Sequence, residues 1–158
     1  MISEEVTKLI GRVGDIRIME VEGGAIKKYA DAVDDHNPIY WDEEYAKNSR
    51  YGSIVAPPGF FGWPIRWTGG MPVYTKLNYE ASAILAQAGY TRNLDGGIEC
   101  EFFCPVRAGD ILTALPRIID IYEREGRTGK LVFLVIETTY TNQNGDLAAK
   151  ARQTTIHR

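Results

Sequence analysis

The second half of the chain, from Gly97 onward, has the alternating hydrophobic period of β-strands, and this pattern constrains the fold more than any other feature. Clusters of turn-forming residues divide it, and Asn144-Gly145 is a strong hairpin signal because both residues tolerate positive φ. Short turns join consecutive strands in antiparallel sheets. The pattern therefore predicts an antiparallel sheet with strands at residues 98–104, 111–124, 131–142 and 147–157.

The strand expected over residues 131–142 is unusual because its first part, residues 131–136, is apolar at every position. A strand with one face in water would alternate between apolar and polar residues. We therefore expect this strand to be covered on both faces, or to be central in a larger assembly. A sheet with open edges also invites pairing with another chain.

The first half of the chain reads mainly as helix. A strand over residues 12–21 is followed by a helix whose apolar face has the spacing i, i+3, i+4, i+7, formed by Ile26, Tyr29, Ala30 and Val33. Asn37-Pro38 ends that helix, because the residue before proline avoids the helical region. Asp42 is expected to cap a short helix that runs through Lys47.

A buried helix is predicted to start at Gly59, after Pro57-Pro58, because the segment is almost entirely apolar and proline suits a first helical turn. Pro64 would kink or end it. Residues 81–89 are a further candidate helix, and the rest of 69–97 reads as loop. The expected fold is α+β: a single domain, residues 1–158, in which an antiparallel sheet of about five strands wraps round one buried central helix.

Composition excludes several classes of function. With 44% apolar residues the 158-residue chain can bury a core, and its net charge of −3 lacks the basic footprint of a nucleic-acid-binding protein. No apolar run is long enough to span a membrane, and the first residues do not resemble a secretory signal, so a cytoplasmic protein is expected. Cys100 and Cys104 would lie about 13 Å apart on one strand. Neither a disulfide nor a metal site is expected from them.

Residues 34–42 (DDHNPIYWD) bring two carboxylates, an imidazole and an amide into one loop. They could be ordinary polar turn residues facing water, because Asp and Asn favour turns for local reasons. They are also the kind of residues that perform general acid and base chemistry.

Four segments resemble the MaoC-like (R)-specific enoyl-CoA hydratases, and most of all the FAS1-like dehydratase N-terminal type. Residues 29–40 (YADAVDDHNPIY) are similar to the family signature Gly-Asp-x-Asn-Pro-x-His. The other landmarks are residues 51–58 (YGSIVAPP), 96–110 (GGIECEFFCPVRAGD) and 141–146 (TNQNGD). Their order and spacing cover nearly the whole chain, and the resemblance implies a hot-dog fold.

In active members of this family, an aspartate and a histidine hold the water that adds to a trans-2-enoyl thioester, or that leaves in the reverse reaction. The resemblance also implies a backbone N–H at the start of the central helix that holds the thioester oxygen. It implies an acyl-CoA or acyl-carrier-protein thioester as ligand and no cofactor. The expected assembly is a homodimer, or a heterodimer with a second hot-dog subunit. In it the two subunits lie side by side and their sheets join into one continuous sheet.

The chain departs from the family at two positions. Asp35 and Asn37 match the signature, but Tyr40 stands where the histidine is expected, and a phenol with a pKa of about 10 is a poor base. Pro58 takes the place of the usual glycine and has no N–H to donate. Gly59 is the alternative donor, and with Pro58 and Phe60 it forms the expected substrate-binding segment.

These departures lead to several hypotheses. The first is an acyl-binding subunit that lacks the catalytic histidine and pairs with a hot-dog partner carrying the Asp–His dyad. The second is an active homo-oligomeric hydratase that uses Asp35 with Tyr40 or His36, although nothing in the sequence aims His36 at Asp35. The third is a non-catalytic acyl-CoA-binding scaffold. A thioesterase is the weakest, since only the fold class suggests it.

Overall fold

The computed structural model of the protein describes residues 2–65, 73–127 and 129–158. Its helices are α1 (Glu4–Thr7), α2 (Gly23–Ala32), α3 (Glu43–Asn48) and α4 (Val73–Gln87), with a short 3₁₀-helix η1 (Pro38–Tyr40). Its strands are β1 (Arg17–Glu20), β2 (Trp63–Pro64), β3 (Asn93–Phe102), β4 (Ile111–Gly126), β5 (Gly129–Thr141) and β6 (Leu147–His157).

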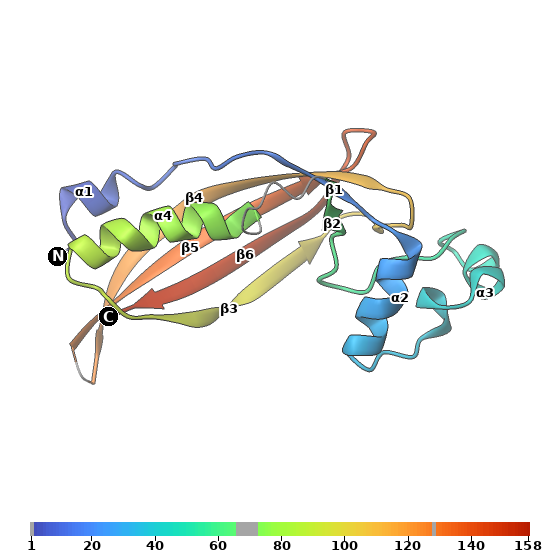
Figure 1. Ribbon diagram of the computed structural model, residues 1–158, viewed down its shortest axis with the longest axis horizontal. Helices are drawn as coiled ribbons and strands as arrows, with labels where there is room; N and C mark the ends of the chain where they lie inside the picture. Colours follow the sequence, from blue (N-terminus) through green and yellow to red (C-terminus); the bar gives the residue numbers. More distant parts are fainter. Residues whose placement is uncertain (1, 66–72, 128) are drawn as a thin grey trace.

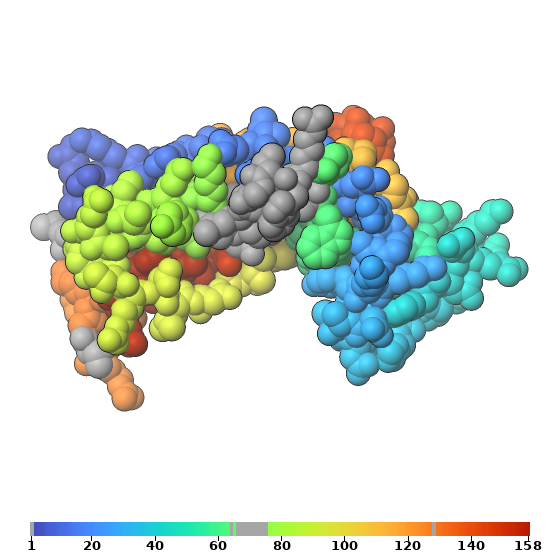
Figure 2. All heavy atoms as spheres, in the orientation of Figure 1, coloured from blue at the N-terminus to red at the C-terminus, as the bar shows by residue number. Residues whose placement is uncertain are grey.

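The strands form one antiparallel sheet in the order β2-β1-β4-β5-β6-β3. Helix α4 lies along one face of this sheet, and α2, η1 and α3 lie together beyond one end of it (Figure 1). The same group, coloured blue to cyan, stands out from the body of the molecule in the space-filling view (Figure 2). Strand β3 pairs only with β6 among the described strands, so its other edge is open.

Helix α4 is held to the sheet by a stripe of buried side chains at helical spacing. Leu77, Ala81 and Leu85 are at most 2% exposed, and they belong to one core cluster with residues of β4 and β5 such as Ile118 and Leu134. The spacing i, i+4, i+8 places all three on one face of the helix. Burial of this stripe makes α4 the central helix of the fold.

A second core cluster joins α2 and the segment after α3 to the opposite end of the sheet. Ile26 and Ala30 of α2 are fully buried in it. Phe61 stacks on Tyr140 of β5 with ring centroids 4.1 Å apart, and on Phe102 of β3 at 6.1 Å. These aromatic contacts fix the segment that follows α3 against the sheet.

The predicted helix starting at Gly59 is wrong. Residues 57–62 form a turn and irregular structure, in which Gly59 and Gly62 have φ of 89° and 81°. A side chain at Gly62 would clash with the carbonyl oxygen of Glu20, so the backbone there passes close beside the end of β1. Phe60 and Phe61 of this segment are buried by tertiary packing. The central helix is α4, of which the sequence pattern indicated only the second half.

Most other predicted elements are confirmed. The four strands of the second half appear as β3 to β6, and α2 and α3 match the two predicted helices. The strand predicted over residues 12–21 is shorter, because residue 13 makes only an isolated bridge to β4. At the last hairpin the side chain of Asn142 accepts from the N–H groups of Asn144 and Asp146, and only Gly145 has positive φ.

The two faces of β5 differ in their environment. Val132, Leu134 and Ile136 are buried on the face that α4 covers. Leu131, Phe133 and Val135 are half-buried on the other face. The sequence predicts that this strand is covered on both faces. Within the described chain only the face toward α4 is fully covered. No helix among the described residues is long and apolar enough to cross a membrane.

Candidate functional site

The loop that follows α2 is shaped by local hydrogen bonds. Asp34 takes a left-handed conformation with φ of 57°, which ends the helix, and the N–H of Asp35 still donates to the carbonyl of Ala30. The Asp35 carboxylate accepts from the N–H of Asn37 at 3.1 Å. Asn37 in turn caps η1 by accepting from the N–H of Ile39 at 3.1 Å. These contacts fix Asp35 and Asn37 within one tight turn.

Tyr40, at the end of η1, is buried, with 9% of its surface exposed. Burial raises the pKa of its hydroxyl above the ordinary value, and the negative charge of Asp35 raises it further. A phenol with a raised pKa stays protonated at neutral pH, so the Tyr40 hydroxyl can donate a hydrogen bond but does not act as a base. The structure brings Asp35 and Tyr40 close enough for the charge of one to affect the other.

His36 lies away from this pair. Its Nε2 atom is 2.9 Å from the carboxylate of Asp34, and both side chains are more than two-thirds exposed. The imidazole therefore faces solvent beside Asp34, and it does not line the cavity described below.

The segment of Pro58, Gly59 and Phe60 forms a turn in which the N–H of Phe60 donates to the carbonyl of Pro57. Phe60 is buried against Tyr29 of α2, with ring centroids 5.3 Å apart. A side chain at Gly59 would meet the hydroxyl of Tyr29 at 3.1 Å, so glycine suits this position by its φ and by its space. Pro58 itself is exposed at the mouth of the cavity.

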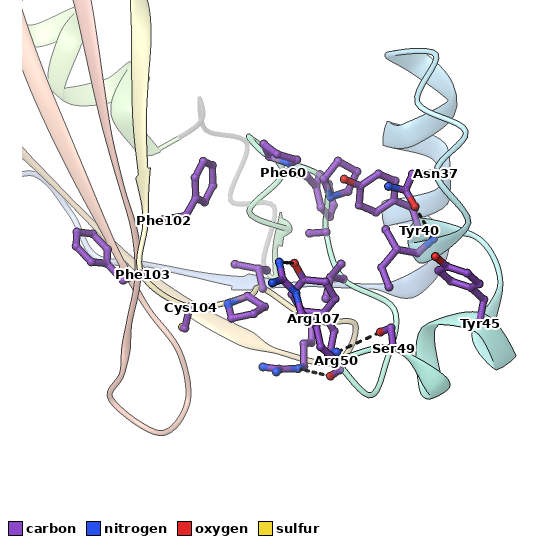
Figure 3. A pocket seen from close by; sticks show the side chains of 18 residues that line it. Asn37, Tyr40, Tyr45, Ser49, Arg50, Phe60, Phe102, Phe103, Cys104 and Arg107 are labelled. Atoms are coloured by element: carbon purple, nitrogen blue, oxygen red, sulfur yellow. Dashed lines mark hydrogen bonds between the residues drawn. The ribbon is translucent and has the colours of Figure 1, made fainter.

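A cavity of about 780 Å³ lies between the helical group and the end of β3 (Figure 3). This volume is within the range of small-molecule sites, which is roughly 300–1,000 Å³. Of the predicted site residues, Asn37, Tyr40, Pro58 and Phe60 line it, whereas Asp35, His36 and Gly59 do not. Its other side carries Phe102 and Phe103 from the end of β3 and the turn after it, both about half exposed.

Two arginines in the cavity wall were not among the predicted site residues. Arg107 donates from Nε to the carbonyl of Tyr51 at 3.2 Å, and Arg50 lies over the Tyr51 ring with its guanidinium carbon 4.7 Å from the centroid. Among the described residues neither guanidinium is paired with a carboxylate. The only indication of them in the sequence is their position next to or within two segments that resemble the family, residues 51–58 and 96–110.

The cysteines contribute no reactive group to this site. Cys104 lines the cavity, and burial raises the pKa of its thiol, as it does for Cys100. Both cysteines are free. Among the residues that the structure describes, no group of three or more His, Cys, Asp or Glu side chains is placed to hold a metal ion.

The sequence matches the family described as FAS1-like, dehydratase domain region, over residues 8–151. It is 29% identical over 139 residues to a probable enoyl-CoA hydratase alpha subunit of Thermomonospora curvata. That alignment covers 80% of this chain and 41% of the relative, so the chain spans less than half the length of that protein.

Solved structures share the fold over nearly the whole chain. The ChsH1-ChsH2 complex of Mycobacterium tuberculosis contains a chain with a TM-score of 0.81 and 19% identity, covering 97% of this chain and 93% of that one. The HadBC (3R-hydroxyacyl-ACP dehydratase) complex of the same organism gives 0.66 and 24%, covering 94% and 96%. A MaoC-like dehydratase of Rhodospirillum rubrum gives 0.59 and 20%, covering 94% and 91%. The expected hot-dog fold is confirmed.

Proposed function

The chain belongs to the family of the FAS1-like dehydratase domain region, and from this premise we propose that it is the acyl-binding subunit of an (R)-specific enoyl-CoA hydratase or 3-hydroxyacyl-thioester dehydratase. In this proposal the chain binds the thioester, and a hot-dog partner with an intact Asp–His dyad performs the proton transfers. The alternative of an active homo-oligomer requires a base within this chain.

The state of Tyr40 is the observation that carries the proposal. It occupies the position of the family histidine, it lines the cavity, and its raised pKa keeps it protonated. Asp35 is close to it but does not line the cavity. A hydratase needs a group that takes a proton from water and another that delivers one to carbon. Tyr40 can donate, but the cavity of this chain offers no base beside it among its described lining residues.

The segment opposite Tyr40 supports the same conclusion. Pro57 and Pro58 have no N–H groups, and the turn that follows them is not a helix N-terminus. An oxyanion is stabilised by preorganised N–H donors that point to one place. This segment therefore suits contact with a substrate more than stabilisation of a developing negative charge.

The cavity does offer recognition of an anionic acyl thioester. Its aromatic wall suits an apolar acyl chain, and Arg50 and Arg107 present guanidinium groups that are free of carboxylate partners in the described structure. Guanidinium groups bind phosphate oxygens by paired, charge-assisted hydrogen bonds. Phosphates of coenzyme A and the phosphopantetheine of a carrier protein share this chemistry.

The pairing with a partner is supported by the open edge of β3 and by the relatives. Ile98 and Phe102 of β3 are 62% and 49% exposed on the same face of this edge strand, so they offer apolar surface that a partner could cover. Two of the similar solved structures are complexes of two different proteins by their names. An antiparallel strand from a hot-dog partner would complete this edge.

The decisive experiment measures enoyl-thioester hydration by the purified chain alone and after addition of a hot-dog protein that carries the Asp–His dyad. We expect no turnover by the chain alone and turnover by the pair. Turnover by the chain alone that disappears in Asp35→Asn would contradict the proposal and favour the homo-oligomeric enzyme. Thioester binding without turnover in either setting would favour the scaffold.

A binding measurement tests the role of the arginines separately. Arg107→Met should weaken the binding of a non-reactive thioether analogue of an acyl-CoA by roughly tenfold or more, because a hydrogen bond to a charged group contributes about 1.5–3 kcal/mol. Arg92→Met, at an exposed arginine outside this cavity, is the matched control and should leave binding unchanged. Equal affinities of the two variants would remove Arg107 from the site.

A further inference from the structure

The face of the sheet opposite α4 presents its side chains in straight rows across four strands. Directly paired residues of neighbouring strands point to the same face, so the register gives the members of each row. One row contains four charged residues, in the order Arg117 on β4, Glu137 on β5, Arg152 on β6 and Glu99 on β3. The sign of the charge therefore alternates across the sheet, beginning with a positive and ending with a negative residue.

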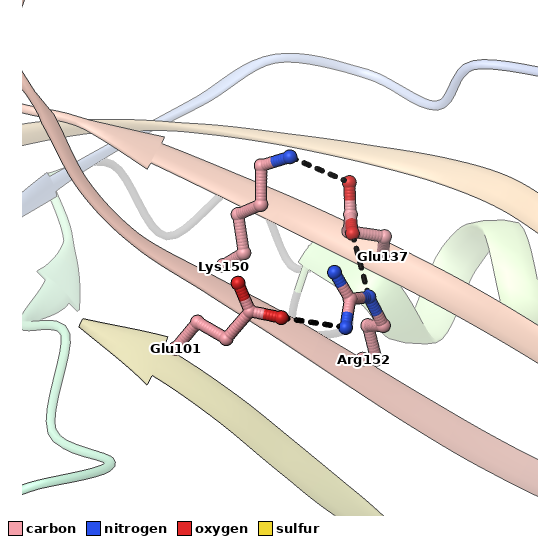
Figure 4. Close-up of polar contacts among 4 residues, drawn as sticks. All are labelled: Glu101, Glu137, Lys150 and Arg152. Atoms are coloured by element: carbon pink, nitrogen blue, oxygen red, sulfur yellow. Dashed lines mark hydrogen bonds and ion pairs between the residues drawn. The ribbon is translucent and has the colours of Figure 1, made fainter. Parts of the chain in front are cut away.

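The inner charges of this row are satisfied within the chain, and the outer ones are not. Arg152 donates from Nε to Glu137 at 2.8 Å and from Nη1 to Glu101 at 2.7 Å, as Figure 4 shows. Arg117 and Glu99, at the two ends, are exposed and make no ion pair with any described residue. The row thus ends in two unpaired charges of opposite sign.

A second row on the same face is apolar along its whole length. Its members are Tyr122 on β4, Phe133 on β5, Ile156 on β6 and Leu94 on β3. Tyr122 and Phe133 stack with ring centroids 4.8 Å apart, and Leu94 is 54% exposed. An apolar row across four strands is costly to leave in water. A surface that covers this face would therefore need an apolar band opposite the apolar row and charges of opposite sign opposite the charged row.

We propose that this surface is a second copy of the chain, packed back to back about a two-fold axis that runs parallel to the strands between β5 and β6. Such an axis places β4 of one copy over β3 of the other, and β5 over β6, while each row stays at its own level. Arg117 then faces Glu99 of the second copy, and Glu137 faces Arg152 of the second copy. The alternating row is complementary to its own image, whereas a row with like charges at both ends would repel it.

The apolar row obeys the same symmetry. Tyr122 faces Leu94 of the second copy, and Phe133 faces Ile156 of the second copy. Four strands about 4.8 Å apart and about 33 Å long cover roughly 600 Å² per copy, or about 1,200 Å² in total, which is at the lower limit of stable interfaces. We therefore infer a reversible dimer. This dimer leaves the edge of β3 open, so the proposed hot-dog partner could still pair there. The dimer proposal does not depend on that partner.

Sedimentation velocity of the chain alone, over a micromolar concentration series, tests this interface. The chain should form a reversible dimer. Arg117→Glu places like charges opposite each other twice, and should weaken the dimer by roughly tenfold or more. The double variant Arg117→Glu with Glu99→Arg restores opposite charges at both ends and should regain most of the affinity. Both positions are exposed, so the fold is expected to persist, which circular dichroism would verify.

Two further variants separate this face from the edge of β3. Phe133→Glu should abolish the dimer, because it places a carboxylate in the apolar row. Ile98→Lys, on β3 but on the α4 face of the sheet, should leave it unchanged. A chain that is monomeric at every concentration would overturn the proposal. So would a dimer that survives Arg117→Glu and Phe133→Glu and is lost in Ile98→Lys, since that dimer would form through the edge.

Discussion

Replacing Leu85 by alanine tests whether α4 is held to the sheet as the structure describes. The side chain of Leu85 is fully buried, in the same core cluster as Leu77, Ala81 and the β5 residues Val132 and Leu134. Of the three buried residues of this stripe, only Leu77 and Leu85 have large side chains. Removing the Leu85 side chain should therefore weaken the packing of α4 on the sheet and lower the free energy of unfolding.

The magnitude follows from the cost of removing buried carbon atoms. Leucine-to-alanine changes in protein cores cost about 2.7–5 kcal/mol, and the larger values occur where the cavity cannot collapse. A rigid sheet on one side and a helix on the other resist collapse, so we expect about 3–4 kcal/mol. For a domain of this size each kcal/mol lowers the melting temperature by about 2–4 °C, giving a decrease of roughly 10 °C.

Urea denaturation followed by circular dichroism measures this free energy of unfolding directly. Tyr79→Ala is the matched control, because Tyr79 is on the same helix and 66% exposed. Its change should stay within about 0.5 kcal/mol. If Leu85→Ala costs less than about 1 kcal/mol, or no more than the control, α4 does not pack on the sheet through this stripe.

Two other predictions concern stability. His157 is buried, with its Nε2 atom 3.1 Å from the hydroxyl of Thr155, and burial lowers its pKa. The unfolded chain therefore takes up a proton before the folded chain does, so stability should fall as pH drops below about 6.5. Urea midpoints at neutral and mildly acidic pH should show a smaller fall in His157→Gln than in His36→Gln. Asp42 accepts from the N–H groups of Glu44 and Tyr45, so thermal denaturation of Asp42→Ala should show a loss of about 1 kcal/mol. An unchanged melting temperature would mean that this cap does not stabilise the fold.

Local features of the sequence predicted the parts of the fold that local forces determine. The cap at Asp42, the end of α2 before Pro38 and the strands from β3 to β6 depend on residues close in sequence. The polar turn of the site belongs to this group, since the side chains of Asp35 and Asn37 accept hydrogen bonds from N–H groups only two residues further along the chain. The family motif could therefore be identified without the fold.

The central helix could not be located in the same way. Its buried stripe contains Ala81, whose small side chain adds little to the hydrophobic pattern. The segment starting at Gly59 is more apolar, but its glycines and prolines favour a turn. Both segments contribute buried apolar side chains, and apolar content indicates burial without indicating the secondary structure that achieves it.

The sequence by itself determined the fold class, the family and the replacement of the expected histidine by Tyr40, because these follow from residue identity and order. Only the tertiary structure decided which residues share the cavity. Arg107 reaches the carbonyl of Tyr51 across 56 positions of the chain. The row from Arg117 to Glu99 likewise depends on the register of four strands. Register and long-range contacts arise from the packing of whole elements, which no local pattern contains.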